Sequence, residues 1–143
     1  MKFNAAVLDK ERLKERAYTE AQYIFDKDST RRGRTLHEVR INCLIGHAAE
    51  LYLIDYCGFK DDPRPYKDVF DPSDNPAEIK VIRNAKDVYF VLKRANEYAL
   101  DLWRDYPKLL YIFVVNEYSG DYALHGIYNW NGKEFVCLMN VNQ

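Results

Sequence analysis

The sequence is poor in the residues that mark secreted, membrane-spanning and phosphate-loop proteins. Its three cysteines (Cys43, Cys57 and Cys137) are an odd number without a C-x-x-C pair, which indicates a reduced, cytoplasmic chain. The longest apolar run, residues 109–115, is far shorter than the ~20 residues of a membrane span, and we expect no signal peptide. None of the six glycines belongs to a phosphate-binding loop, which argues against a kinase or another P-loop enzyme.

What the chain does contain is typical of one globular domain spanning residues 1–143. Hydrophobic residues make up 48% and charged residues 30%, and 12 tyrosines and 7 phenylalanines can fill a core. A net charge of −1 excludes a strongly basic, non-specific coat for nucleic acid. Charge is nevertheless uneven along the chain. Residues 10–40 contain nine basic and six acidic residues, residues 61–78 contain two basic and six acidic residues, and residues 79–108 contain seven basic and four acidic residues. An acidic segment therefore lies between two basic ones.

Capping residues and apolar spacing predict two helices in the first part of the chain. Asp9 can cap a helix that runs to about residue 27, with apolar residues at spacings of three and four. Residues 28–34, which include three arginines, are expected to form a basic loop. Thr35 and Glu38 form a capping box for a second helix, which continues to residue 57 and ends at Gly58.

The rest of the chain favours strands, interrupted by one helix. We expect a hairpin of two strands, at residues 66–70 and 77–82, and a third strand at 87–92. A helix at 94–106, which Pro107 ends, comes next. Three further strands follow at 109–117, 122–128 and 134–139. Residues 87–92 could instead begin the helix that follows, but their β-branched and aromatic side chains favour a strand. The order of elements indicates a mixed α/β fold.

Two carboxylates and one lysine come together in the predicted hairpin. Glu78 and Lys80 lie two residues apart on a strand, so their side chains point to the same face, and the residues between and after them point into the core. In a hairpin centred on Ser73, Asp68 lies opposite Glu78. Two neighbouring carboxylates repel unless a cation lies between them, and a hard divalent cation such as Mg²⁺ suits this oxygen cluster.

Asp71 is the alternative partner of Glu78. That pairing would place Pro72 inside the ladder, where it has no N–H to donate, whereas the pairing with Asp68 leaves Pro72 and Pro76 in or beside the turn. The sequence therefore favours Asp68 and leaves Asp71 as the second candidate.

The segments Lys67-Asp68-Val69-Phe70 and Ala77-Glu78-Ile79-Lys80 resemble the catalytic hairpin of the PD-(D/E)XK nuclease superfamily. The α-β-β-β-α-β core of that superfamily matches the elements expected over residues 35–117. Many members place a glutamate in the preceding helix, often after a glycine, as in Gly46-His47-Ala48-Ala49-Glu50. The resemblance implies a restriction-endonuclease-like fold, a mixed central sheet flanked by helices, here with an extra N-terminal helix and C-terminal β-strands.

The resemblance also implies a function, that of a Mg²⁺-dependent endonuclease that hydrolyses phosphodiester bonds, in DNA rather than RNA. Asp68, Glu78 and the backbone carbonyl of Ile79 would ligate Mg²⁺, for which Mn²⁺ can substitute. Lys80 would orient or help to deprotonate the attacking water. Glu50 would hold a second metal through water or position Lys80.

Basic residues on both sides of the acidic site are candidates for phosphate contacts, namely Arg31, Arg32, Arg34 and Arg83. We expect a homodimer, in which two sites address two strands, and no membrane partner. The alternative function is a non-catalytic nucleic-acid-binding or protein-interaction module on the same scaffold. His47 and Glu50 also have the spacing of a metal pair, but no second such pair is present, which argues against a di-iron bundle or a zinc protease.

Overall fold

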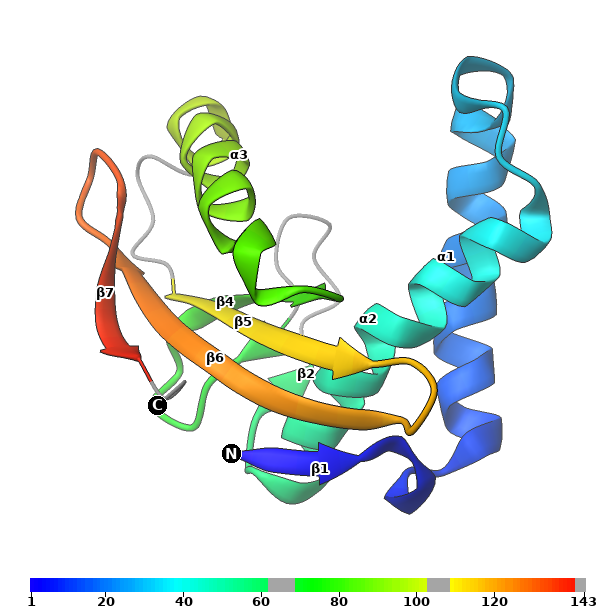
Figure 1. Ribbon diagram of the computed structural model, residues 1–143, viewed down its shortest axis with the longest axis horizontal. Coiled ribbons are helices and arrows are strands. Elements are labelled where there is room, and N and C mark those ends of the chain that lie inside the picture. The colour runs from blue at the N-terminus through cyan, green and yellow to red at the C-terminus, as the bar shows by residue number, and fades with distance from the viewer. Residues whose placement is uncertain (62–68, 103–108, 141–143) are drawn as a thin grey trace.

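The computed structural model describes residues 1–61, 69–102 and 109–140, without the side chains of residues 28–32 and 101–102 (Figure 1). It is a mixed α/β protein. In chain order its elements are β1 (Lys2–Asn4), the 3₁₀ helix η1 (Ala5–Val7), α1 (Lys10–Arg32), α2 (Leu36–Tyr56), β2 (Lys60–Asp61), β3 (Val69–Phe70), β4 (Pro76–Ile82), the 3₁₀ helix η2 (Ala85–Asp87), α3 (Val88–Leu102), β5 (Leu109–Asn116), β6 (Asp121–Trp130) and β7 (Phe135–Asn140).

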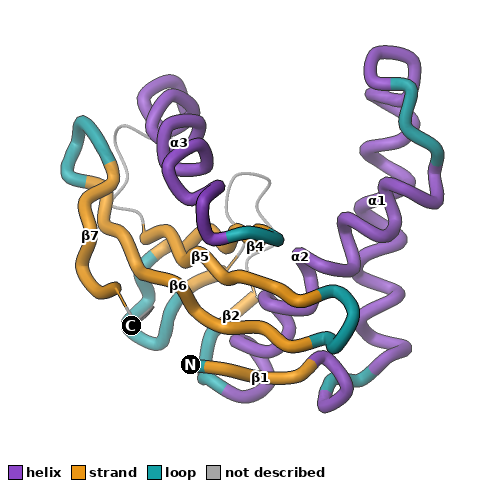
Figure 2. The backbone as a smooth tube through the Cα atoms, in the orientation of Figure 1, coloured by secondary structure: helices purple, strands orange, loops and turns teal. Residues whose placement is uncertain are grey.

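The described strands form one curled sheet in the order β1-β6-β5-β4-β3-β2, and β7 also pairs with β6. Strands β4 and β5 run parallel, and α3 lies between them in the chain, while the other pairs are antiparallel. Figure 2 shows α3 on one side of the sheet, away from α1 and α2. No helix in the described ranges is long and apolar enough to cross a membrane.

Strand β5 separates the two halves of the core. Phe113 packs with Leu51 of α2 on one face of the sheet. Leu110 and Ile112 pack with Ala99 of α3 on the other face. All of these residues are fully buried, and burying a large apolar side chain contributes about 1.5–3 kcal/mol. The predicted burial of this strand on both faces is therefore confirmed.

The helix starts follow the predicted caps. Asp9 Oδ1 accepts hydrogen bonds from the backbone N–H groups of Glu11 and Arg12, at 3.1 and 3.2 Å. Thr35 Oγ1 accepts one from Glu38 N at 3.2 Å, and Gly58, with φ +75°, follows the end of α2. The predicted basic loop 28–34 is mostly wrong, because α1 continues to Arg32. No glycine or proline interrupts the helix before residue 33.

The third predicted strand, residues 87–92, is wrong. Asn84 caps η2 and α3 begins at Val88. Val88, Val91 and Leu92 pack with the α3-side cluster, the apolar group that contains Ala99, Leu110 and Ile112. Tyr89 and Phe90, in contrast, are 79% and 59% exposed. This is the spacing of a helix face, so packing overrides the strand preference of β-branched and aromatic residues. The expected end of the helix at Pro107 lies outside the described residues.

The β3–β4 hairpin has the predicted register. Val69 pairs with Ala77 and Phe70 with Pro76, so the hairpin is centred on Ser73. Residues 66–68 of the expected first strand lie outside the described ranges. Strand β2, which was not among the expected strands, pairs with β3 and supplies another strand before β4.

The C-terminal strands agree with the sequence analysis. Strands β5, β6 and β7 cover the three predicted segments, and the turn between β6 and β7 contains Gly132 at φ +97°. Asn131 Oδ1 accepts hydrogen bonds from the N–H groups of Lys133 and Glu134, both at 2.9 Å. Strand β1, which was not expected, pairs with the start of β6.

Two substitutions test the helical assignment of residues 88–92. We expect Phe90→Asp to change the free energy of unfolding by less than about 0.5 kcal/mol, because the side chain faces solvent. Val91→Asp should lower it by about 1–3 kcal/mol, because it places a carboxylate against the apolar α3-side cluster. Urea denaturation measures both values. The reverse ranking would contradict the helix, since a strand would place Phe90 with Val88 and Leu92.

Candidate active site

Strand β4 presents the two central residues of the predicted site. Ala77, Ile79 and Val81 pack into the cluster under α2, so alternation places Glu78 and Lys80 on the opposite face of the strand. Glu78 is 8% exposed, whereas Lys80 is exposed. The Lys80 Nζ atom lies 3.6 Å from Glu78 Oε1, so the ammonium group partly balances the buried carboxylate.

Of the two candidate aspartates of the hairpin, only Asp71 is among the described residues, and Asp68 lies outside them. Asp71 is buried and belongs to the turn. Its carboxylate accepts hydrogen bonds from Ser73 N, Asn75 N and Asn75 Nδ2, at 2.9, 2.8 and 3.1 Å. These bonds hold the Asp71 carboxylate within the turn.

A cleft of about 380 Å³ lies between α1, α2 and β4. Within the described residues, β3 pairs with β4 only at Pro76 and Ala77. The part of β4 that lines the cleft, residues 79–81, comes after these paired residues. The polar and charged residues that line it include Glu20, Arg34, His47, Glu50, Lys80 and Arg83. The structure therefore brings predicted residues from the second helix and from the hairpin to one cleft.

Glu50 occupies the α2 wall of the cleft and is 9% exposed. Arg16 of α1 lies with Nη2 3.4 Å from Glu50 Oε1, and its Nη1 lies 2.6 Å from Asp61 Oδ2. Burial lowers the pKa of Arg16, because it disfavours the charged guanidinium. The hydrogen bond to Asp61 and the negative charges of Asp61, Glu50 and Glu20 outweigh this effect, so the pKa of Arg16 is raised. A permanent cation thus faces the buried Glu50 carboxylate.

Glu20 and His47 belong to this cleft, and the sequence analysis did not bring them together. His47 Nε2 is hydrogen-bonded to Glu20 Oε2, and His47 Nδ1 lies 3.7 Å from Glu50 Oε2. The hydrogen bond from His47 lowers the pKa of Glu20 against the effect of burial, and the charges of Lys80 and Arg16 act in the same direction. The available signal was a polar stripe at i, i+4 and i+8 on the first helix, formed by Arg12, Arg16 and Glu20.

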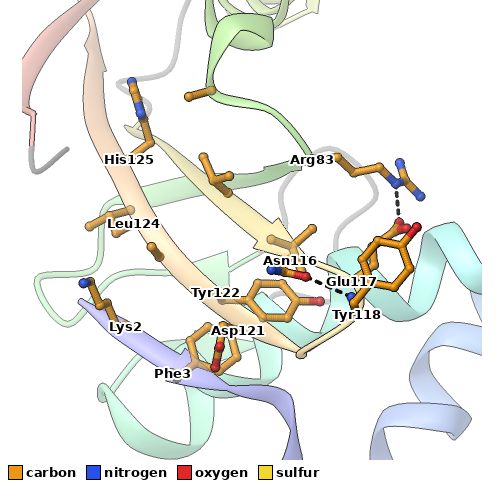
Figure 3. Close-up of a pocket in the computed structure, with 14 residues that line it drawn as sticks. Lys2, Phe3, Arg83, Asn116, Glu117, Tyr118, Asp121, Tyr122, Leu124 and His125 are labelled. Atoms are coloured by element: carbon orange, nitrogen blue, oxygen red, sulfur yellow. Dashed lines mark hydrogen bonds and ion pairs between the residues drawn. The ribbon is translucent and has the colours of Figure 1, made fainter.

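The predicted phosphate contacts are only partly described. Arg34 lines the cleft, and the side chains of Arg31 and Arg32 lie outside the described set. Arg83 is ion-paired with Glu117 and donates to Asn42 Oδ1 at 3.1 Å. It also lines a larger hollow of about 1020 Å³ along β1, β5 and β6, where Figure 3 shows its contact with Glu117. A phosphate that binds Arg83 would therefore compete with Glu117.

Within residues 1–61, 69–102 and 109–140, no three histidine, cysteine, aspartate or glutamate side chains are arranged to hold a metal ion. The predicted ligand Asp68 is not among those residues. No family model, curated protein or solved structure matches the chain. The resemblance to the nuclease superfamily therefore rests on the hairpin residues, the helix glutamate and the order of elements.

Cys43 gives a test of the electrostatics of this cleft. Burial raises the pKa of the Cys43 thiol to about 11, and the charges of Glu20 and Glu50 add to this effect. Only the thiolate is a good nucleophile, so we expect Cys43 to react slowly with iodoacetamide at about pH 8 and faster as the pH approaches that value. Peptide mapping should show exposed Cys137 alkylated first, and Cys137→Ser should remove that fast phase. Equal rates for Cys43 and Cys137 would contradict this assignment.

Proposed function

We propose that the protein is a Mg²⁺-dependent endonuclease that hydrolyses phosphodiester bonds in DNA. The observation that carries this proposal is the placement of Glu78 and Lys80 on β4. Lys80 lies 3.6 Å from Glu78 and also lines the cleft that contains Glu50. The expected pairing of Asp68 with Glu78 would add a second carboxylate, and carboxylates beside a lysine are the groups that metal-assisted phosphodiester hydrolysis needs.

In the proposed site, Asp68, Glu78 and the backbone carbonyl of Ile79 hold Mg²⁺, and Mn²⁺ substitutes for it. The donor set fits, because these are oxygen ligands and Glu78 is a buried carboxylate beside the ammonium group of Lys80. When bound, the metal polarises the phosphate and lowers the pKa of a water molecule. Lys80 orients that water and offsets the negative charge that develops on the phosphate. Glu50, on the α2 wall, positions Lys80.

The order of elements supports a restriction-endonuclease-like core. From α2 to β5 the chain runs helix, three strands, helix, strand, with β2, β3 and β4 as the three strands and β4 parallel to β5. The three strands differ from those first expected, since β2 replaces residues 87–92. This order of helices and strands is consistent with the proposed core, with α1 before it and β6 and β7 after it.

The proposed substrate is DNA, held in part by Arg31, Arg32, Arg34 and Arg83, and the proposed assembly is a homodimer in which each site addresses one strand. The second candidate is a non-catalytic nucleic-acid-binding or protein-interaction module. The ion pair between Arg83 and Glu117 favours its protein-interaction form, because it partly neutralises one of the proposed phosphate contacts.

Metal-dependent nicking of supercoiled plasmid tests the proposal. We expect cleavage with Mg²⁺ or Mn²⁺ and none with a chelator. Glu78→Gln and Lys80→Ala should each lower the rate by at least about 100-fold, because Glu78 would hold the metal and Lys80 would act on the attacking water and the phosphate. The matched controls are Glu134→Gln and Lys133→Ala, in the exposed turn before β7, which should keep the wild-type rate. Wild-type cleavage by Lys80→Ala would refute this site, and DNA binding without cleavage under either metal would favour the second candidate.

The arginines give a separate prediction about binding. Replacing Arg31, Arg32 and Arg34 with alanine should weaken binding to every DNA sequence alike, because phosphate contacts carry no sequence information. The slope of log K against log salt should fall by about one unit for each arginine that no longer binds a phosphate. Fluorescence anisotropy at several salt concentrations measures this slope. An unchanged slope would show that these side chains do not contact phosphates.

A further inference from the structure

Helix α1 lies beside α2 (Figure 1). Among the described side chains, three ion pairs spaced one turn apart along α1 join the two helices. From the N-terminal end, they are Arg12 with Asp55, Arg16 with Glu50, and Glu20 with His47. The first contact lies outside the cleft, whereas Glu20, His47 and Glu50 all line it. The three contacts therefore differ in their relation to the candidate site.

His47 stands between two carboxylates. Its Nε2 is hydrogen-bonded to Glu20, and its Nδ1 lies 3.7 Å from Glu50 Oε2. The residue is 9% exposed, and Nδ1 has no hydrogen-bond partner among the described residues. A buried nitrogen left in this way is costly unless a small movement completes a hydrogen bond, and the Glu50 carboxylate is the acceptor in reach.

We propose that Glu20 and His47 are positioning residues for Glu50. The Glu20 carboxylate fixes the orientation of the His47 ring, and the ring then directs its Nδ1–H toward Glu50. In this role Nε2 is hydrogen-bonded to Glu20 and Nδ1 is directed at Glu50. The ring and Arg16 thus hold Glu50 through its two different oxygen atoms.

The charges around the ring are consistent with this role. Arg16, Glu20 and Asp61 face it or its partners from α1 and β2, Glu50 from α2 and Lys80 from β4. A carboxylate that orients a histidine, which in turn orients a reactive group, is a common supporting arrangement in enzyme and metal sites. The catalytic consequence of this proposal rests on the proposed nuclease function, but the geometric part does not.

The test compares Glu20→Gln with Arg12→Ala. Both variants remove one ion pair between α1 and α2, but only Glu20→Gln affects the ring that faces Glu50. In plasmid cleavage we expect Glu20→Gln to lower kcat by about 10- to 100-fold with KM unchanged, the size typical when a supporting residue is replaced. Arg12→Ala should keep the wild-type kcat. Equal kcat for the two variants, or an effect confined to KM, would overturn the proposal.

A readout without substrate separates this proposal from the nuclease assignment. ¹⁵N NMR should resolve the two ring nitrogens of His47, with the same resonances in the wild type, in Arg12→Ala and in the presence of chelator. Glu50→Gln should shift the Nδ1 resonance and leave Nε2 nearly unchanged. If wild-type protein cleaves nothing but these shifts are seen, the nuclease function fails and the positioning geometry stands. An Nδ1 resonance insensitive to Glu50→Gln would overturn the positioning role whatever the activity.

Discussion

The burial of two carboxylates, Glu50 and Glu78, is the constraint on which the candidate site depends. Each is less than a tenth exposed, and a buried carboxylate needs cations or hydrogen-bond donors in place of the water it has lost. Arg16 reaches Glu50 from α1, and Lys80 reaches Glu78 along β4. The first helix is therefore part of the site, because it supplies the guanidinium that faces Glu50 and the carboxylate that binds His47.

Strand periodicity ties the same site to the hydrophobic core. Ile79 and Val81 pack under α2, which leaves Glu78 and Lys80 on the opposite face of β4. A slip of one residue would bury the lysine and expose the isoleucine, so the core itself specifies the register. Parallel pairing with β5, whose side chains are buried on both faces, holds β4 from one side, and the turn centred on Ser73 sets its register from the other.

The sequence allowed prediction of features that local chemistry decides. Thr35 caps α2, Gly58 follows its end, and proline chemistry centres the hairpin on Ser73. Residues 87–92 were predicted wrongly because their composition favours a strand, while their helical spacing matters only once the sheet is present to receive it. The short strands β1 and β2 depend on pairing with distant residues. The contact between Glu20 and His47 joins two helices, so the polar stripe on the first helix could indicate a polar face but not the residue that it meets.

Lys80 connects this architecture with the proposed chemistry. Its ammonium group lies 3.6 Å from Glu78 Oε1, and its charge also acts on Glu20 across the cleft. It therefore balances carboxylates from both walls. In the proposed site Glu78 would hold the divalent cation, and Lys80, which already lines the cleft, would orient the attacking water and offset the negative charge that develops on the phosphate.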